Sequence, residues 1–163
     1  MNIPVGEIIE ENVSLKDVNI GKKLSELMNE KVTGYIVLTV EGRSGIEEGL
    51  GIIKDGILIG GIYEYIRFGK IIYGDTAMAQ LLNSGLAEFG VMDIGRLSKQ
   101  QIELIIAFNE RIELKNKLSQ KELLSAMPKK YNAGSAETEL VKGLKKKESK
   151  FDILKRIGLG GVR

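Results

Sequence analysis

The sequence predicts an α+β fold, in which an antiparallel β meander is packed against helices and followed by a short basic tail that is helical on binding. Three observations predict it. Residues 34–67 form successive short segments rich in β-branched and aromatic side chains, as strands do. Asp55-Gly56 interrupts them with a dipeptide typical of a two-residue hairpin turn. Residues 98–117 repeat apolar side chains at helical spacing, and residues 129–163 are strongly basic.

The first half of the chain is expected to hold one helix and three strands. Ile20, Leu24 and Leu27 share one face at the helical period, which predicts a helix that ends before Gly34. The expected ranges are a helix at 20–31 and strands at 34–41, 46–54 and 57–67. The third strand is apolar on both faces, so we expect a helix, the N-terminal segment or another subunit to cover its second face.

The second half is expected to be mainly helical. Asp75 or Thr76 is the predicted cap of a helix that stops at Gly85. Two capping-box patterns, which begin at Ser98 and Ser119, open the next two helices. The expected ranges are helices at 75–84, 98–117 and 119–127 and a strand at 86–94. Asn109 lies on the apolar face of the longest helix and needs a hydrogen-bond partner if it is buried.

The charge distribution separates a body from a tail. Residues 129–163 hold ten basic and four acidic side chains, a net charge of about +6, whereas residues 1–128 hold 14 basic and 18 acidic, about −4. Pro128 follows a helical pattern and precedes small polar residues. We therefore predict a globular domain at 1–128 and a linker and tail at 129–163, with the linker at 129–139.

Composition excludes several classes of protein. The chain of 163 residues has no cysteine, histidine or tryptophan, so disulfides, thiolate or imidazole metal sites and Cys- or His-dependent catalysis are absent. No apolar run approaches the roughly 20 residues that span a bilayer, and the N-terminus shows no secretory signal. We expect a cytoplasmic protein without membrane insertion, catalytic residues, cofactor or metal.

The glycine-rich stretch at 51–74, together with Gly49 just before it, is interpreted as packing. Gly51 to Gly56 has the spacing of a phosphate-binding loop, but Ile57 follows where that loop needs lysine. Gly49 and Gly51 lack the third glycine of a dinucleotide fingerprint. We therefore expect Gly56 to form a hairpin turn and the other two glycines to admit a close neighbour.

Two groups of side chains are candidates for partner binding. Tyr63 and Tyr65 stand near a cation, which permits base stacking, although core or interface packing is favoured because the body is acidic. In the tail, a lysine cluster precedes an apolar stripe that is too short to form an isolated helix and is expected to fold on docking. The tail candidates are Lys145, Lys146, Lys147, Phe151, Leu154 and Ile157.

The stretches "GYIVLTVEG", "EEGLGIIKDGILIGGIYEY", "GDTAM" and "GVMDIGRLSKQQIELIIAFNE" resemble an uncharacterised archaeal domain family of small cytoplasmic proteins. The first part is more distantly similar to PATAN-type domains of prokaryotic two-component signalling proteins. The resemblance covers about residues 3–115 and implies a fold and a signalling or assembly role, without a catalytic residue. Its matched positions are scaffold positions: Gly34, Gly42, Asp55, Gly56, Gly74, Asp75, Ala77, Asp93, Ser98 and Asn109.

Three functional hypotheses follow. The leading one is a non-enzymatic adaptor or regulatory module that presents a sheet face or edge to an unidentified protein partner, with a homodimer as a further alternative. The second is nucleic-acid binding through the basic tail. The third is a small-ligand sensor or carboxylate-dependent enzyme, which requires a pocket lined by Glu64, Tyr63 or Asp75.

Overall fold

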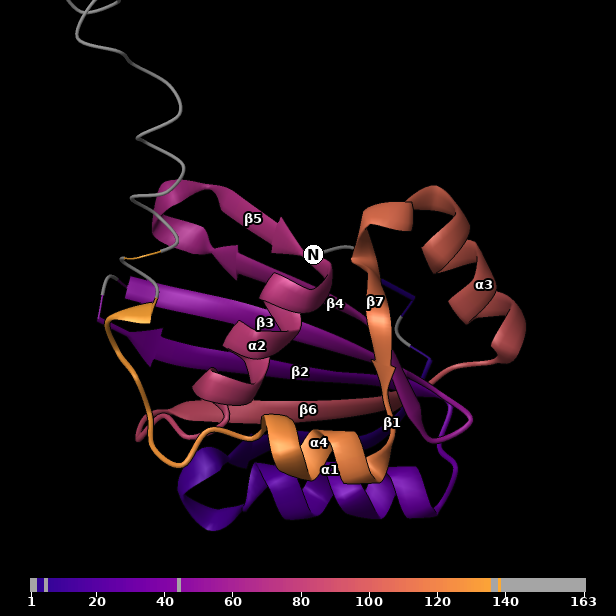
Figure 1. Ribbon diagram of the computed structural model, residues 1–163, viewed down its shortest axis with the longest axis horizontal. Coiled ribbons are helices and arrows are strands. Elements are labelled where there is room, and N and C mark those ends of the chain that lie inside the picture. The colour runs from indigo at the N-terminus through magenta and orange to yellow at the C-terminus, as the bar shows by residue number, and fades with distance from the viewer. Residues whose placement is uncertain (1–2, 5, 44, 136–137, 139–163) are drawn as a thin grey trace, which may run out of the picture.

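The protein has an α+β fold built on one antiparallel sheet (Figure 1). The structure is a computed structural model that describes residues 3–4, 6–43, 45–135 and 138. The strands are β1 (Glu7–Ser14), β2 (Gly34–Gly42), β3 (Gly45–Lys54), β4 (Ile57–Tyr65), β5 (Lys70–Tyr73), β6 (Gly90–Arg96) and β7 (Glu113–Leu118). The α-helices are α1 (Ile20–Asn29), α2 (Gly74–Ser84), α3 (Lys99–Phe108) and α4 (Gln120–Ala126). Short 3₁₀ turns lie at Leu15–Asp17, Ile66–Phe68 and Glu110–Ile112.

The strand order is β1-β6-β2-β3-β4-β5, and β7 also pairs with β4. β5 pairs with the second half of β4, from Ile62 to Tyr65, whereas β7 pairs with the first half at Leu58 and Gly60. Two short strands therefore share the outer edge of β4. None of the described helices is both long and apolar enough to cross a bilayer.

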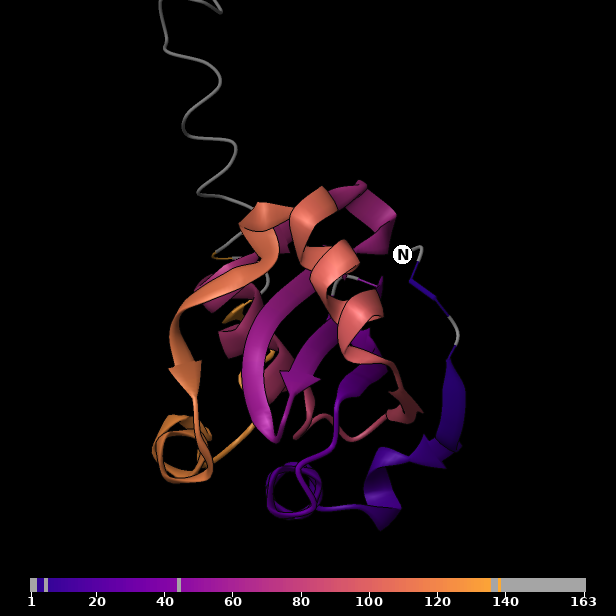
Figure 2. The same ribbon diagram turned by 90° about the vertical axis from the view of Figure 1, so that its right-hand side faces the viewer.

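Two hydrophobic clusters lie on opposite faces of the sheet. The larger includes Leu24 of α1, Leu81 of α2 and Leu123 of α4, packed on the sheet. The smaller joins Ile102 of α3 to Leu50 of β3. Figure 2 views the molecule from the α3 side, with α1 and α4 together at its base. Three helices thus cover one face, and α3 covers part of the other.

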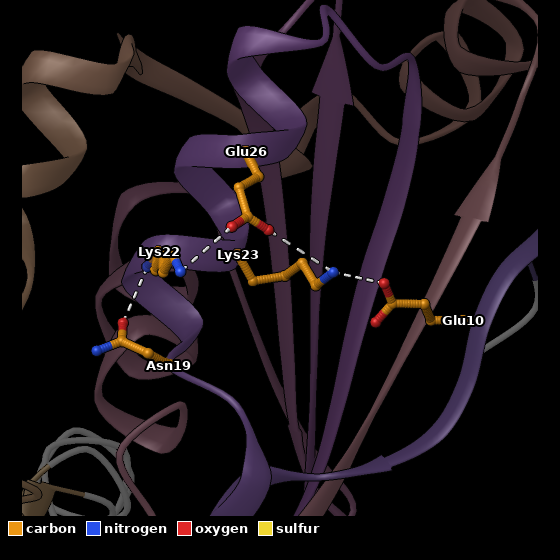
Figure 3. A network of polar contacts seen from close by, with 5 residues as sticks. All are labelled: Glu10, Asn19, Lys22, Lys23 and Glu26. Atoms are coloured by element: carbon orange, nitrogen blue, oxygen red, sulfur yellow. Dashed lines mark hydrogen bonds and ion pairs between the residues drawn. The ribbon is translucent and has the colours of Figure 1, made fainter.

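An ion-pair network ties α1 to the edge strand β1 (Figure 3). Asn19 caps α1 and accepts a hydrogen bond from the backbone N–H of Lys22 at 2.9 Å. The ammonium group of Lys23 lies 2.5 Å from Glu10 Oε1 and 3.8 Å from Glu26 Oε2. Because Lys23 and Glu10 are partly buried, this pair is shielded from solvent better than a surface pair. It holds β1 beside the helix that packs under the sheet.

Local turn and cap predictions are confirmed. Asp55 and Gly56 have φ values of 51° and 77°, which form the predicted two-residue hairpin turn. The Gly56 N–H donates to Val32 O at 3.0 Å, so this turn is also fixed to the end of the α1 segment. Both predicted capping boxes, Ser98 with Gln101 and Ser119 with Glu122, are formed.

The packing interpretation of the glycine stretch is confirmed at Gly49 and Gly51. A Cβ on Gly49 would lie 2.7 Å from a Leu81 methyl carbon and 2.8 Å from the Tyr63 ring. A Cβ on Gly51 would lie 2.8 Å from the other Leu81 methyl carbon. These distances are shorter than real carbon contacts, so the two glycines are needed for α2 to approach the sheet.

The predicted helix at 98–117 is wrong in its second half. α3 ends at Phe108, because Asn109 takes φ −152° and ψ 66°, outside the helical region. Residues 113–118 form β7 instead and pair with β4. The free backbone groups on the outer edge of β4 favour a strand here, although the apolar spacing also fits a helix.

Other boundaries also require correction. The strand predicted at 86–94 is β6 at Gly90–Arg96, and the edge strands β1 and β5 were not predicted. The cap of α2 is Tyr73, so neither Asp75 nor Thr76 caps this helix. Asp75 Oδ1 accepts a hydrogen bond from Lys115 N at 3.1 Å, which ties α2 to β7. Gly85 is the C-cap of α2, as predicted.

Candidate interaction surface

One half of the sheet remains accessible on the α3 side. Along β2, Leu38 and Val40 are buried against the covered face, whereas Val37 and Thr39 are half-buried and Glu41 is exposed. This alternation shows that one face of the strand is packed and the other is only partly covered. We call the accessible surface the open face, defined by Val37, Thr39, Glu41, Ile46, Glu48, Glu64, Ile71, Val91 and Asp93.

Strand register arranges the open face in rows. Directly opposed pairs run Val91–Thr39, Thr39–Glu48, Glu48–Glu64 and Glu64–Ile71 across five strands. Glu48 and Glu64 are therefore neighbours across two strands. With Glu41 and Asp93, four of the nine residues of the open face are acidic and none is basic.

Asp93 is partly engaged within the fold. Its Oδ1 accepts a hydrogen bond from Asn12 N at 2.6 Å, where β1 bulges and Asn12 has a φ of 55°. The negative charge of Asp93 adds to burial in raising the pKa of Tyr35. Asp93 therefore supports the β1 edge, while Glu41, Glu48 and Glu64 lie farther along the face.

An apolar groove adjoins the open face, and we call it the α3 groove. Its volume is about 570 Å³. It is lined by Ile3, Pro4, Ile62, Ile71, Tyr73, Gln101, Leu104, Ile105, Phe108 and Asn109. Phe108 is 87% exposed and Leu104 is 56% exposed. Ile71 belongs to both surfaces, so the acidic open face passes directly into an apolar groove, and such contiguous exposed apolar surface is typical of binding sites.

The two candidate tyrosines lie inside the covered core. Tyr63 and Tyr65 are each 1% exposed, and their rings meet edge-on with centroids 5.3 Å apart. Neither side chain is accessible to a partner in this structure. Of the two alternatives, core packing and partner binding, the structure shows core packing. The sequence showed two apolar faces on β4 but not which of them the helices would cover.

Tyr63 bonds a buried carboxyl group that the sequence analysis missed. Its hydroxyl donates to Glu47 Oε2 at 2.7 Å, and Glu47 is 5% exposed. Burial raises the pKa of Glu47, and the hydrogen bond from Tyr63 opposes part of that rise. Burial and then the Glu47 charge raise the pKa of Tyr63. The sequence did hold a signal for this burial. Side chains alternate along a strand, so Glu47 lies on the same face of β3 as Gly49, and that face packs against Leu81 of α2.

The Glu47 pair has no room for a substrate. The nearest cleft is lined by Ile46, Glu47, Tyr65, Arg67 and Phe68 and has no volume for a water molecule. The sensor constellation of Glu64, Tyr63 and Asp75 is not brought together, because consecutive β4 residues point to opposite faces and Asp75 is exposed on α2. Among the described residues, no group of three or more acidic side chains is placed to hold a metal ion.

The start of the linker is fixed to α2. Asn83 Oδ1 accepts from Asn132 N at 2.8 Å, and Asn83 Nδ2 donates to Asn132 O at 3.1 Å. The Ser135 hydroxyl lies 2.8 Å from Gln80 Oε1. Burial, and then the negative charge of the nearby Glu47, raise the pKa of Tyr131. Residues 127–135 therefore run past α2 to the β2–β3 turn, as Figure 1 shows.

The tail candidates Lys145, Lys146, Lys147, Phe151, Leu154 and Ile157 lie outside the described residues. The domain boundary at 128 stays a prediction, although residues 131–135 contact the body through the bonds to α2.

Comparison with protein families shows a match over more than half of the chain. The model of a family described as an uncharacterized protein conserved in archaea (DUF2226) matches residues 1–109. This match spans β1 to the end of α3 and so includes the open face and every residue that lines the α3 groove. No curated protein and no solved structure matches the chain significantly.

Proposed function

The chain belongs to this family of archaeal proteins, and we propose that it is a non-enzymatic adaptor or regulatory module that binds a protein partner through the open face and the α3 groove. The proposed setting is cytoplasmic signalling or assembly. The similarity to PATAN-type domains stays a prediction and is the basis of the signalling alternative.

The observation that carries this proposal is the continuity of an acidic sheet face with an exposed apolar groove. Leu104 and Phe108 project from α3 with more than half of each side chain exposed, and they line the same groove as Ile71, which is paired with Glu64 in the sheet. Acidic surface attracts lysine and arginine, and the groove can bury apolar side chains. The partner chemistry that fits is a segment in which basic residues adjoin an apolar helical stripe.

Nucleic-acid binding remains a second proposal, supported by the net charge of about +6 in residues 129–163. The acidic open face would repel phosphates, so this activity would depend on the tail alone. A gel shift at low salt that disappears when residues 140–163 are deleted would support it. A shift that is absent at low salt would eliminate it. A thermal-shift screen with nucleotides and divalent ions is the corresponding test of a ligand sensor.

The adaptor proposal is tested by affinity purification from the source organism with matched surface variants. The double variant Leu104→Asp/Phe108→Asp places charges in the α3 groove. The control Leu124→Asp changes a leucine that is 61% exposed on α4, on the covered side. We expect one protein to be recovered with the wild type and the control but lost with the groove variant. Equal recovery with both variants, or no recovered protein at low salt, would overturn the proposal.

A further inference from the structure

We propose that residues 145–157 of the chain itself occupy the open face and the α3 groove when no partner is bound, and so compete with partners for them. This inference rests on the proposed function for the identity of the binding surface. It adds a regulatory element: the chain carries its own ligand.

The tail has the chemistry that the surface requires. Lys145, Lys146 and Lys147 precede Phe151, Leu154 and Ile157. The lysines complement the acidic residues of the open face, and the apolar stripe matches the lining of the α3 groove in character. Seven residues with one apolar stripe do not form a stable helix alone, so docking supplies the contacts that would order them.

The order of lysines and apolar residues along the tail also matches the order in which the tail would meet the acidic open face and the α3 groove. The linker is fixed to α2 through Ser135, and the segment 127–135 runs to the β2–β3 turn end of the sheet (Figure 1). From that end, the open face presents the opposed pair Glu41–Ile46, then Glu48–Glu64, and then Leu50–Ile62. Ile62 is part of the α3 groove. A chain entering from the turn therefore meets the carboxylates of Glu41, Glu48 and Glu64 before it reaches the α3 groove, as the tail presents lysines before its apolar stripe.

The linker is long enough for this path. Ten residues separate Ser135 from Lys145, and sixteen separate it from Phe151. An extended chain covers about 3.3 Å per residue, so these segments reach about 33 Å and about 53 Å. A domain of this size has a radius of gyration of about 14 Å. The tail can therefore pass from the α2 side around the sheet to the α3 side.

Charge and tethering favour the chain's own tail over a free segment. The domain carries a net charge of about −4 and the tail about +6. A tether of this length gives an effective concentration on the order of millimolar, so even a weak contact is populated. A partner with the same chemistry must displace the tail, which lowers its apparent affinity.

Disulfide formation in the full chain tests the inference, because the natural sequence has no cysteine. The variant Leu104→Cys/Leu154→Cys places one thiol in the groove and one in the tail. The matched control Leu124→Cys/Leu154→Cys uses the exposed leucine of α4. We expect intrachain disulfide formation to be about tenfold faster in the groove pair, and replacing all three lysines at 145–147 by glutamate to remove the difference.

Equal rates for the two pairs would overturn the inference, and so would a groove pair that is unaffected by the lysine replacements. Disulfide-linked dimers in place of intrachain bonds would overturn docking within one chain and indicate exchange between copies.

A measurement without cysteines is limited chymotrypsin cleavage after Phe151. The cleavage rate is expected to be about tenfold faster in Leu104→Asp than in the wild type and unchanged in Leu124→Asp. If these tests fail while a partner still depends on Leu104 and Phe108, the adaptor proposal survives and only tail docking is lost.

Discussion

The two faces of the sheet are built for different tasks. On the covered face, Gly49 and Gly51 allow α2 to approach, and Leu81 fills the space against them. On the open face, the same strands place Thr39, Glu48 and other polar residues at positions that α3 leaves accessible. One strand can thus supply a packing surface and a recognition surface, because its side chains alternate. The glycines that resemble a ligand-binding loop serve the first task.

The largest expected difference between the faces is in stability. Leu81→Ala removes buried methyl groups from the contact with Gly49 and Gly51, and we expect it to lower the free energy of unfolding by about 2–5 kcal/mol. Ile46→Ala changes an open-face residue that is 47% exposed and should cost about 0.5 kcal/mol or less. Urea unfolding measures both. Similar losses for the two variants would show that the open face is also a packed surface.

A smaller effect is expected from the carboxyl group buried on the covered face. Because burial raises the folded-state pKa of Glu47, the protonated carboxyl favours folding below its unfolded pKa, and this contribution is lost as pH rises through the folded pKa. Glu47→Gln should therefore stabilise the protein at pH 8, by about 1 kcal/mol, and leave it no more stable than wild type at pH 4. Unfolding at the two pH values measures this.

The exposed carboxylate of Glu41 provides the control for that experiment. Glu41→Gln lies on the open face, where a surface substitution should change the free energy of unfolding by about 0.5 kcal/mol or less. A Glu47→Gln variant that is less stable than wild type at pH 8 would mean that the bond from Tyr63 outweighs burial of the charge.

The smallest stability effect is expected for the opposed acids of the open face. Glu48→Gln/Glu64→Gln removes two like charges that face each other and should change the free energy of unfolding by about 0.5 kcal/mol or less. The same variant should accelerate chymotrypsin cleavage after Phe151, because the lysines lose their electrostatic partners. Cleavage at the wild-type rate would show that Glu48 and Glu64 do not contribute to docking of the tail.

Local features of the fold could be predicted, and features set by distant contacts could not. The Asp55-Gly56 turn and the cap at Ser98 depend on neighbouring residues, so the sequence was sufficient for them. The apolar spacing at 113–118 fits either element, and the outer edge of β4 decides in favour of a strand.

The candidate site shows the same limit. Tyr63 and Tyr65 were named as candidates for partner binding because an apolar strand face suits a core and an interface equally well. The structure buries both side chains in the core. Phe108 was interpreted as part of a broad apolar stripe, and its exposure became evident only when α3 ended there. The acidic row required strand register, because Glu48 and Glu64 are sixteen residues apart in the sequence.

Isoleucine-methyl NMR spectra of the full chain test the central claim most directly. The spectrum of the wild type is compared with that of the variant carrying glutamate in place of the three lysines at 145–147. We predict methyl shift changes at Ile62, Ile71 and Ile105 of the open side and none at Ile20 or Ile36 of the covered side. Changes confined to the covered side, or identical spectra, would contradict docking of the tail on the open face and the α3 groove.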